Sequence, residues 1–204
     1  MTKSIYFAGG CFWGTEHYFK QVRGVVATEV GYANGRVPEE ALKAVPAGRT
    51  AAQASQNAIA AQVAPQPTQW APTYEEVYTD TTGFVETVRI EYDPERVSLQ
   101  LLGELFFRSI DPTSLNRQGE DIGTRYRTGV YYTDAGDRPL FEALFLQVEA
   151  AVGQPLAVEL EPLQNFYPAE DYHQDYLDKH PEGYCHLPWS LMQFAKEANA
   201  EASR

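Results

Sequence analysis

Residues 5–22, IYFAGGCFWGTEHYFKQV, combine a short apolar run, a pair of glycines and an amphipathic segment in direct succession. The apolar run at residues 5–8 predicts a short buried strand, which Gly9-Gly10 interrupts. From Phe12 to about Val22 the apolar side chains recur at a spacing that suits a helix. The single cysteine of this stretch, Cys11, is therefore expected at a strand-to-helix junction.

That position favours a reactive thiol at Cys11. The first backbone N–H groups of a helix are unpaired, and with the positive end of the helix dipole they stabilise a thiolate. We therefore expect a depressed pKa and a nucleophilic sulfur near neutrality. The alternative is a cysteine packed as a small apolar side chain.

Two large aromatic residues, Phe12 and Trp13, follow the cysteine directly. Neighbouring side chains on a helix point about 100° apart, so both cannot face the same interior. One of them should project beside the thiol. An aromatic wall in that place suits a small apolar group of a substrate, such as a methyl.

The remaining periodicities predict strands and helices that alternate, with some strands joined without a helix. We expect one α+β domain in which helices pack on a mixed or antiparallel sheet. The expected strands are residues 25–30, 84–92, 129–133 and 156–160; the expected helices are residues 98–109, capped by Ser98, and residues 139–151, with a further helix from Ser190.

The chain length of 204 residues is typical of one domain with a substantial core. Residues 36–71 are rich in Ala, Gln and Pro and predict a surface insertion. We expect a catalytic domain at residues 1–187, interrupted by that insertion. Residues 188–204 are expected to form a C-terminal tail or packing helix.

Charge and apolar content exclude several classes of partner. The net charge of −12 disfavours nucleic acids and anionic membrane surfaces. No apolar run approaches the roughly 20 residues that span a bilayer, and the N-terminus lacks the features of a signal peptide. We therefore expect a cytoplasmic protein. In that compartment its two cysteines are expected to be reactive thiols or buried apolar residues, because structural disulfides are rare there.

Glu86 is an anomaly in the clearest strand. It shares a face with Phe84, Val88, Ile90 and Tyr92, where a buried carboxylate is costly. One interpretation is a position at a sheet edge near solvent. The other is a carboxyl group whose pKa is raised by burial, so that it donates a proton near pH 7.

The second cysteine, Cys185, lies in the glycine-bearing segment Gly183-Tyr184-Cys185-His186. A mobile second thiol can resolve an oxidised first thiol as a disulfide. An idle exposed cysteine is one alternative. A metal site formed with His173, His180 and His186 is another, but the spacing matches no established zinc pattern, so no metal is expected.

Four further residues are candidates because each stands in a polar loop or at a helix end beside Gly, Asp or Pro. They are Tyr74, Asp121, Tyr126 and Tyr176.

Several motifs in the same order resemble the peptide methionine sulfoxide reductase A family. The first, GGCFWGTE at residues 9–16, is similar to the active-site signature of that family. Further similar motifs lie at residues 30–32, 72–77, 82–86, 111–113, 116–127, 169–174 and 183–185. Together they extend over nearly the whole chain to about residue 187, apart from the insertion.

The resemblance implies a ferredoxin-like α/β plait and reduction of the S epimer of methionine sulfoxide, free or in proteins. It implies no metal or organic cofactor, with thioredoxin as the external reductant and an intramolecular disulfide as the intermediate. At matching positions, the implied roles are Cys11 as nucleophile, Glu86 as acid assisted by Tyr74 and Tyr126, Cys185 as resolving thiol, and Phe12, Trp13, Asp121 and Tyr176 in substrate binding.

The chain departs from the family pattern at four places. The insertion before Tyr74 is longer than usual, and Phe84 and Ile110 stand where the family commonly has histidines. Some members carry an additional cysteine at the position of Tyr78. Loss of the histidines indicates either a drier site that favours neutral Glu86 or a diverged enzyme with another substrate.

Three other functions are compatible with the same residues. A thiol peroxidase would use both cysteines, but its peroxide substrate has no methyl group that could bind against the aromatic pair. A cysteine hydrolase needs a histidine base beside the nucleophile, and none is tied to Cys11 by the sequence. A non-catalytic redox-sensing or peptide-binding module is the third possibility.

Overall fold

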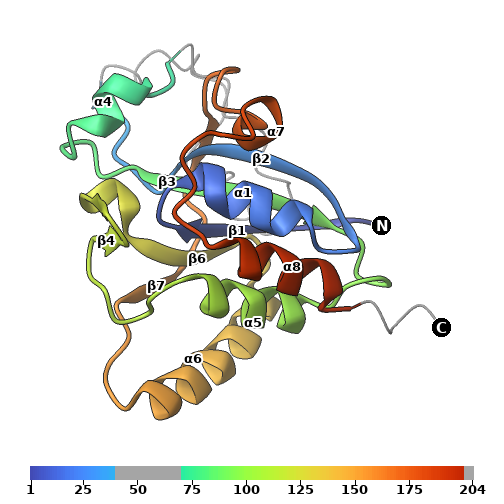
Figure 1. Ribbon diagram of the computed structural model, residues 1–204. Helices are drawn as coiled ribbons and strands as arrows, with labels where there is room; N and C mark the ends of the chain where they lie inside the picture. Colours follow the sequence, from blue (N-terminus) through green and yellow to red (C-terminus); the bar gives the residue numbers. More distant parts are fainter. Residues whose placement is uncertain (40–69, 200–204) are drawn as a thin grey trace.

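The computed structural model describes residues 1–39 and 70–199 (Figure 1), so most of the predicted insertion lies outside the described residues. The described chain is an α+β domain built on a six-stranded mixed sheet, which confirms the predicted fold class. The sheet order is β7-β6-β1-β3-β2-β8, in which β6 and β7 pair parallel and all other neighbours pair antiparallel. Its strands are β1 (Lys3–Gly9), β2 (Val25–Ala33), β3 (Val85–Tyr92), β6 (Thr128–Tyr132), β7 (Val158–Pro162) and β8 (Phe166–Pro168).

The four longer helices follow the predicted segments closely, whereas the short helices at residues 74–78 and 176–179 were not predicted. Capping residues explain some of the helix ends. The Ser98 side chain accepts a hydrogen bond from the amide of Leu101, as expected for an N-cap. Gly153 ends α6 in the left-handed region. The helices are α1 (Phe12–Lys20), α4 (Tyr74–Tyr78), α5 (Leu99–Ser109), α6 (Arg138–Val152), α7 (Tyr176–Lys179) and α8 (Trp189–Glu197), with short 3-10 turns η1 (Thr124–Tyr126) and η2 (Ala135–Asp137).

Residues 111–127 are polar and contain more structure than their composition indicates. They form a two-stranded ribbon of β4 (Arg117–Gln118) and β5 (Asp121–Ile122), followed by η1. Gly123, with a φ of 145°, links the ribbon to η1 in a conformation that favours glycine. Strands of two residues are too short to show a period in the sequence, so pattern alone does not reveal them.

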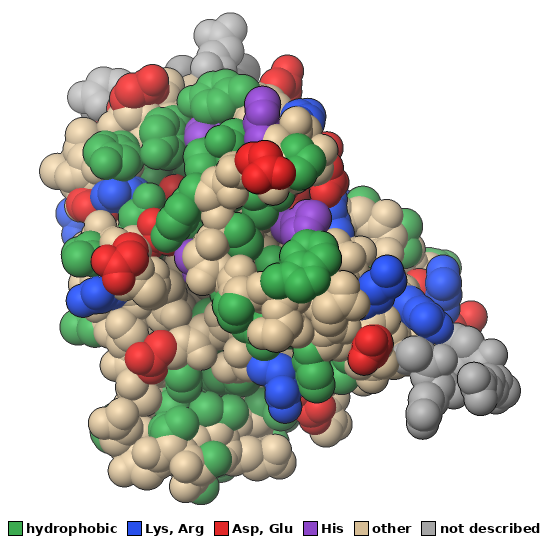
Figure 2. All heavy atoms as spheres, in the orientation of Figure 1, with side chains coloured by type: hydrophobic (Ala, Val, Ile, Leu, Met, Phe, Trp, Pro, Cys, Tyr) green, Lys and Arg blue, Asp and Glu red, His purple; other side chains and the backbone are tan. Residues whose placement is uncertain are grey.

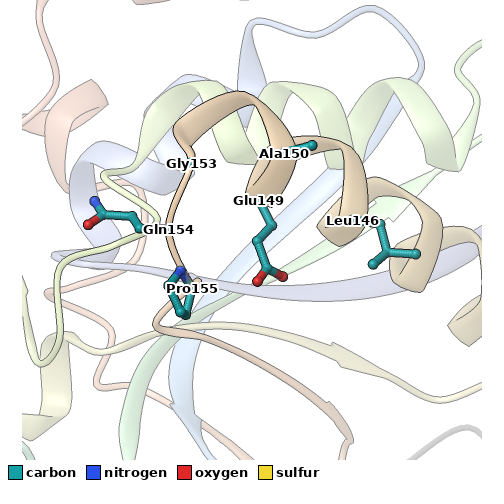
Figure 3. Close-up of a pocket in the computed structure, with 6 residues that line it drawn as sticks. All are labelled: Leu146, Glu149, Ala150, Gly153, Gln154 and Pro155. Carbon is teal, nitrogen blue, oxygen red and sulfur yellow. The ribbon is translucent and has the colours of Figure 1, made fainter.

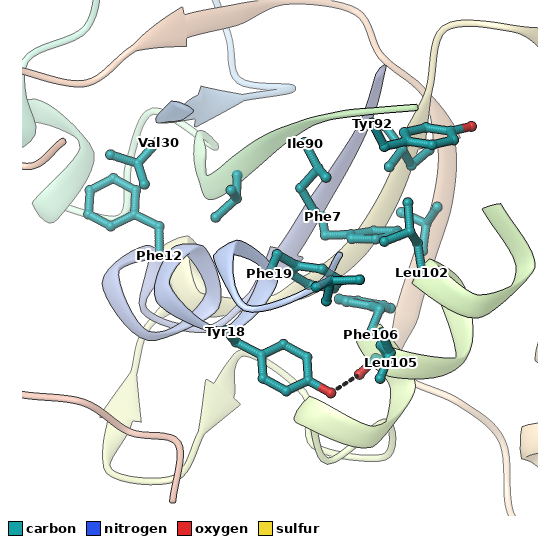
Figure 4. Close-up of a cluster of buried hydrophobic side chains, with 14 of the residues drawn as sticks. Phe7, Phe12, Tyr18, Phe19, Val30, Ile90, Tyr92, Leu102, Leu105 and Phe106 are labelled. Carbon is teal, nitrogen blue, oxygen red and sulfur yellow. Dashed lines mark hydrogen bonds between the residues drawn. The ribbon is translucent and has the colours of Figure 1, made fainter. Parts of the chain in front are cut away.

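The main core lies between the sheet and helices α1, α5, α6 and α8. Phe7 of β1 packs against Phe19 of α1 and stacks on Phe106 of α5, with ring centroids 5.2 and 4.7 Å apart (Figure 4). The hydroxyl of Tyr18 donates to the carbonyl of Leu105 at 3.2 Å, which joins α1 to α5. Helix α1, which directly follows Cys11, is therefore packed against both the sheet and α5.

Strand β3 has the predicted alternation, because Val88, Ile90 and Tyr92 belong to the main core and Val85 to a smaller cluster on the opposite face. The strand lies between β1 and β2, so Glu86 is central in the sheet. The interpretation of Glu86 as an edge residue near solvent is therefore wrong.

The C-terminal segment packs on this domain as far as the structure describes it. Met192 and Ala195 of α8 are buried in the main core, and the Asn199 side chain donates to the carbonyl of Arg23. Through residue 199 the segment therefore contacts the rest of the domain. Among the described residues, no helix has both the length and the apolar character needed to cross a bilayer.

Candidate functional site

Cys11 is the residue immediately before α1, as the sequence predicts. Gly10 has a φ of +82°, and a Cβ at that position would lie 2.7 Å from Cβ of Gln118, so the turn requires glycine. The backbone amides of Trp13 and Gly14 interact with the Cys11 sulfur from the first turn of the helix. The predicted helix-start geometry is therefore present around a side chain that is only 6% exposed.

The expected depression of the Cys11 pKa is wrong. Burial raises the pKa of this thiol well above its ordinary value, and the nearby carboxyl group of Glu86 raises it further. The amides of Trp13 and Gly14 oppose this shift, but removal of the sulfur from water is the larger effect. The resting thiol is consequently neutral, and it becomes nucleophilic only as its proton is taken up in the reaction.

Glu86 approaches this helix start from β3. The carboxyl oxygen Oε2 accepts the backbone N–H of Phe12 at 3.0 Å, and the side chain is 2% exposed. Burial raises the pKa of Glu86 to about 8, against the opposing effects of the Phe12 amide and the Arg125 charge. The group is therefore mostly protonated at pH 7. With Oε2 accepting the Phe12 N–H, the neutral carboxyl group can carry its proton on Oε1 and donate it from there.

The two aromatic residues after Cys11 have different environments, as predicted. Phe12 is buried in the main core, whereas Trp13 is partly exposed. The indole stacks on Tyr176 of α7 with ring centroids 3.8 Å apart, and its Nε1 donates to Nδ1 of His173 at 3.1 Å. These contacts hold the Trp13 ring in one orientation, at the side of the nucleophile.

Tyr74 and Tyr126 reach the site from separate elements, α4 and η1. Burial and the nearby Glu86 carboxyl group raise the pKa of Tyr74 to about 12, and the same causes raise the pKa of Tyr126. Both phenols therefore remain protonated at neutral pH and can donate hydrogen bonds. The Arg125 guanidinium lies over the Tyr126 ring, 4.4 Å from its centroid, and pairs with Asp80 at 2.7 Å.

Asp121 of β5 lies on another side of the cysteine. One of its carboxylate oxygens accepts the hydroxyl of Tyr184 at 3.1 Å. Its oxygen, the Cys11 sulfur and a ring nitrogen of His186 all lie within 4.8 Å of one another. In the described part of the chain, these three residues are the group whose ligand atoms lie close enough together to hold a metal ion. The set considered from the sequence was a different one: His173, His180, Cys185 and His186.

Cys185 lies against the first turn of α1. Its sulfur is partly buried and donates to the carbonyl of Leu187 at 3.4 Å. A Cβ built on Gly14 would lie 3.3 Å from this sulfur and 2.7 Å from Nδ1 of His186. Gly14, three residues after Cys11, therefore leaves room for the C-terminal segment because it has no side chain.

Three side chains that shape the site were given no role beside Cys11 from the sequence: His173, Arg125 and His186. The two histidines were considered there only as metal ligands. His173 is buried between Phe12, Trp13 and Tyr74. It lies in the family-like motif at residues 169–174, and that motif is the sequence feature that could have identified it. The sequence tied no histidine to Cys11, but the fold brings one close to it, because a ring nitrogen of His186 lies within 4.8 Å of the sulfur.

One concave surface of the molecule lies away from Cys11 and the other candidate site residues. An open depression lies at the C-terminal end of α6 and contains none of the predicted site residues (Figure 3). Figure 2 shows histidine and hydrophobic side chains gathered on the face of the molecule that carries α1 and α7. The depression is lined by Leu146, Glu149, Ala150, Gly153, Gln154 and Pro155.

Comparison with known proteins identifies consistent similarities over nearly the whole chain. A family model described as peptide methionine sulfoxide reductase matches residues 3–58 and 66–203. The peptide methionine sulfoxide reductase MsrA of Clostridium acetobutylicum is 41% identical over 191 residues, which cover 94% of this chain and 98% of that protein.

Solved structures give the same result. The reduced form of Mxr1 from Saccharomyces cerevisiae superposes with a TM-score of 0.74 at 33% identity, covering 92% of this chain and 91% of that one. Mxr1 in complex with Trx2 superposes with a TM-score of 0.51 at 25% identity, covering 86% and 84% of the two chains.

Proposed function

This chain belongs to the peptide methionine sulfoxide reductase A family, and from that membership we propose that Cys11, Glu86 and Cys185 carry out its reaction. The protein is an oxidoreductase that reduces methionine sulfoxide to methionine with a thiol. Thioredoxin returns the oxidised enzyme to its reduced form. The observation that carries the residue assignment is the hydrogen bond from the Phe12 amide to Glu86, which holds a neutral carboxyl group beside the nucleophile.

Substrate binding depends on the aromatic wall next to Cys11. The methyl group of the sulfoxide packs against Trp13 and Phe12, and Tyr176 supports the Trp13 ring by stacking. Asp121 contributes a polar contact on the other side of the sulfur. A small apolar group in an aromatic corner fits a methyl sulfoxide, whereas hydrogen peroxide has no such group.

Reduction begins with attack of the Cys11 sulfur on the sulfoxide sulfur. Glu86 donates the proton on Oε1 to the sulfoxide oxygen, and the hydroxyl groups of Tyr74 and Tyr126 donate hydrogen bonds to it. The Cys11 proton is released as the new bond forms, and the carboxylate of Glu86 recovers a proton. The protonated oxygen then passes to the Cys11 sulfur, as its bond to the substrate sulfur and the bond between the two sulfurs break. Methionine leaves, and Cys11 remains as a sulfenic acid that carries the oxygen.

Resolution uses the second thiol. Cys185 attacks the sulfenic sulfur, water leaves, and a disulfide joins residues 11 and 185. Thioredoxin then reduces this disulfide by thiol exchange. The sulfur atoms accept and release both electrons, so the proposed cycle needs neither a metal nor an organic cofactor.

Four finer assignments complete the proposal. The enzyme acts on the S epimer of methionine sulfoxide. The catalytic domain comprises residues 1–187, with an insertion at about 36–71, and residues 188–204 form a C-terminal element. The core is a ferredoxin-like α/β plait, supported by the order β6-β1-β3-β2 with α1 and α5 as crossovers. We place the enzyme in the cytoplasm, where thiols are kept reduced.

The test is an assay with separated S and R sulfoxides and with hydrogen peroxide, each supplied with thioredoxin and a reductant. We expect methionine from the S epimer only, and we expect Cys11→Ser to abolish its formation, because a serine hydroxyl is a poor nucleophile toward sulfur. Faster turnover of peroxide than of the S sulfoxide, or near-normal turnover by Cys11→Ser, would contradict the proposal.

A further inference from the structure

His186 follows the resolving cysteine directly, and its ring has a defined hydrogen-bonding state. Nε2 lies 3.1 Å from the carbonyl oxygen of Gly9. A carbonyl oxygen only accepts hydrogen bonds, so Nε2 carries the hydrogen. In the neutral ring, Nδ1 is then the nitrogen with a free lone pair. Nδ1 is shielded from solvent and has no hydrogen-bond partner among residues 1–39 and 70–199.

This ring lies beside both thiols. Nδ1 of His186 and the sulfur of Cys185 both lie close to Gly14. A Cβ built on that glycine would be 2.7 Å from Nδ1 and 3.3 Å from the sulfur. A ring nitrogen of His186 also lies within 4.8 Å of the Cys11 sulfur and of an Asp121 oxygen. The two cysteines are 174 positions apart in sequence, so only the fold brings a base to both of them.

The resolving step needs a base at this place. Burial raises the pKa of the Cys185 thiol, so this sulfur is protonated at neutral pH. In the resting structure the Cys185 thiol donates to the carbonyl of Leu187 at 3.4 Å, so the S–H must turn from that carbonyl toward Nδ1 before the proton is transferred. The thiolate is the attacking species in disulfide formation, so this proton must leave Cys185 during the attack. The leaving hydroxyl group of the sulfenic acid must at the same time gain a proton to depart as water.

We propose that His186 is a catalytic residue of the resolving step, in which Nδ1 accepts the thiol proton of Cys185 and passes it to the leaving oxygen on Cys11. The bond between the two sulfurs forms as the sulfur–oxygen bond of the sulfenic acid breaks. Cys185 is oxidised, Cys11 is reduced from sulfenic acid to disulfide, and one water is released. This inference rests on the proposed function, because it requires a sulfenic acid at Cys11.

The surroundings keep the ring neutral, so that the lone pair of Nδ1 is available to accept a proton. Burial lowers the pKa of His186, against the opposing effects of the Asp121 charge and the Gly9 carbonyl. The titratable groups that face the ring and its immediate neighbours are Cys11 at the start of α1, Asp121 of β5, Tyr184 and Cys185. We expect the disulfide-forming rate to fall as the pH drops through the pKa of His186, because the protonated ring no longer accepts a proton.

The variant His186→Gln removes the basic nitrogen but keeps the hydrogen bond to the Gly9 carbonyl. The glutamine Nε2 occupies the place of the imidazole Nε2 and still donates to the Gly9 carbonyl, but the side chain has no basic nitrogen. Reduced protein is mixed with S methionine sulfoxide in the absence of thioredoxin. Methionine is quantified over time, the disulfide between residues 11 and 185 is quantified by alkylation and mass spectrometry, and sulfenic acid is trapped with a diketone. His17→Asn is the matched control, since His17 lies on α1 and pairs with Asp178.

We expect His186→Gln to form the first methionine at the parent rate, while disulfide formation slows at least about tenfold, within the range of general acid–base effects. The sulfenic acid should accumulate, the acid limb of the pH profile should disappear, and added imidazole should accelerate the disulfide in His186→Gly. His17→Asn should keep both rates.

A parent disulfide rate in His186→Gln, or equal loss of methionine and disulfide in that variant, overturns the proposal, since the ring would then be dispensable or purely structural. If the parent protein itself forms no methionine, the proposed function fails first, and the methionine measurement distinguishes that result.

Discussion

The backbone N–H of Phe12 donates a hydrogen bond to Oε2 of Glu86 at 3.0 Å, across 74 positions of sequence. This contact joins the first residue of α1 to a central strand. It places an acid with a pKa of about 8 next to the residue that precedes the helix, Cys11. The proposed nucleophile and the proposed acid therefore share one buried site, and the proposed mechanism depends on the protonation state of both.

The first prediction concerns the pH dependence of the reductive step. Glu86 donates its proton only below its pKa of about 8, so the single-turnover rate of methionine formation should be full near pH 6 and should fall as the pH rises through 8. Glu86→Gln keeps an oxygen acceptor for the Phe12 amide but has no acidic proton. We expect it to be on the order of 10²-fold slower at pH 7 and to lack the alkaline limb. Rapid-quench measurements from pH 5.5 to 9.5 check both; an unchanged rate in the variant would remove Glu86 from the mechanism.

The same carboxyl group should make the stability of the fold depend on pH. Its pKa is raised from 4.5 to about 8, so its contribution to stability is full below pH 4.5 and is lost as the pH rises through 8. The loss is on the order of 3–5 kcal/mol at high pH. Glu86→Gln should therefore gain stability relative to the parent between pH 5 and 9 in urea unfolding. Glu91→Gln, on the more exposed part of β3, is the control and should follow the parent curve.

Cys185→Ser tests the resolving thiol. Without a second sulfur, the sulfenic acid at Cys11 has no intramolecular partner. We expect roughly one methionine per protein molecule and then arrest in the presence of thioredoxin. Mass spectrometry should find the oxidised form at Cys11. Sustained turnover driven by thioredoxin would exclude the resolving role of Cys185.

His173 should act through the orientation of Trp13. Its Nδ1 accepts the indole N–H at 3.1 Å, so His173→Ala frees the ring that is proposed to bind the methyl group. Loss of one such hydrogen bond corresponds to a rise in KM of roughly 3- to 10-fold with a smaller change in kcat. His173→Asn, whose Oδ1 takes the position of Nδ1, should restore much of the KM. Steady-state kinetics on both variants decide between a positioning role and a purely structural one, for which the asparagine would not rescue.

Gly14→Ala tests the packing of the C-terminal segment on α1. The added methyl group would lie 2.7 Å from Nδ1 of His186 and 3.3 Å from the Cys185 sulfur, so this segment must shift. Alanine favours the helix by about 1 kcal/mol over glycine, so the fold should persist. We expect an intact single turnover but a fall of about tenfold in thioredoxin-driven turnover, the size of a misplaced general base. If cycling is as fast as in the parent, this packing is not used during resolution.

Local patterns in the sequence were sufficient to predict most of the elements. The alternation in residues 84–92, the Ser98 cap and the glycine pair before Cys11 act through neighbours in the chain, and the structure has each of them as expected. The motifs around Cys11 were also sufficient to predict the family. Strands of two residues were not predicted, because they are too short to show a period. The short helices α4 and α7 were not predicted either, although Thr73 and Glu76 form a local capping box at the start of α4.

What the sequence by itself determined was the position of the nucleophile at a helix start and the set of chemical groups available to it. Only the tertiary structure decided their protonation states and their pairings. The pKa of Cys11 depends on its burial under the C-terminal segment and on Glu86 in β3, and the base near Cys185 depends on the Gly9 carbonyl at the other end of the chain. Desolvation and hydrogen bonding between distant residues arise only when the chain is folded, so no local pattern contains them.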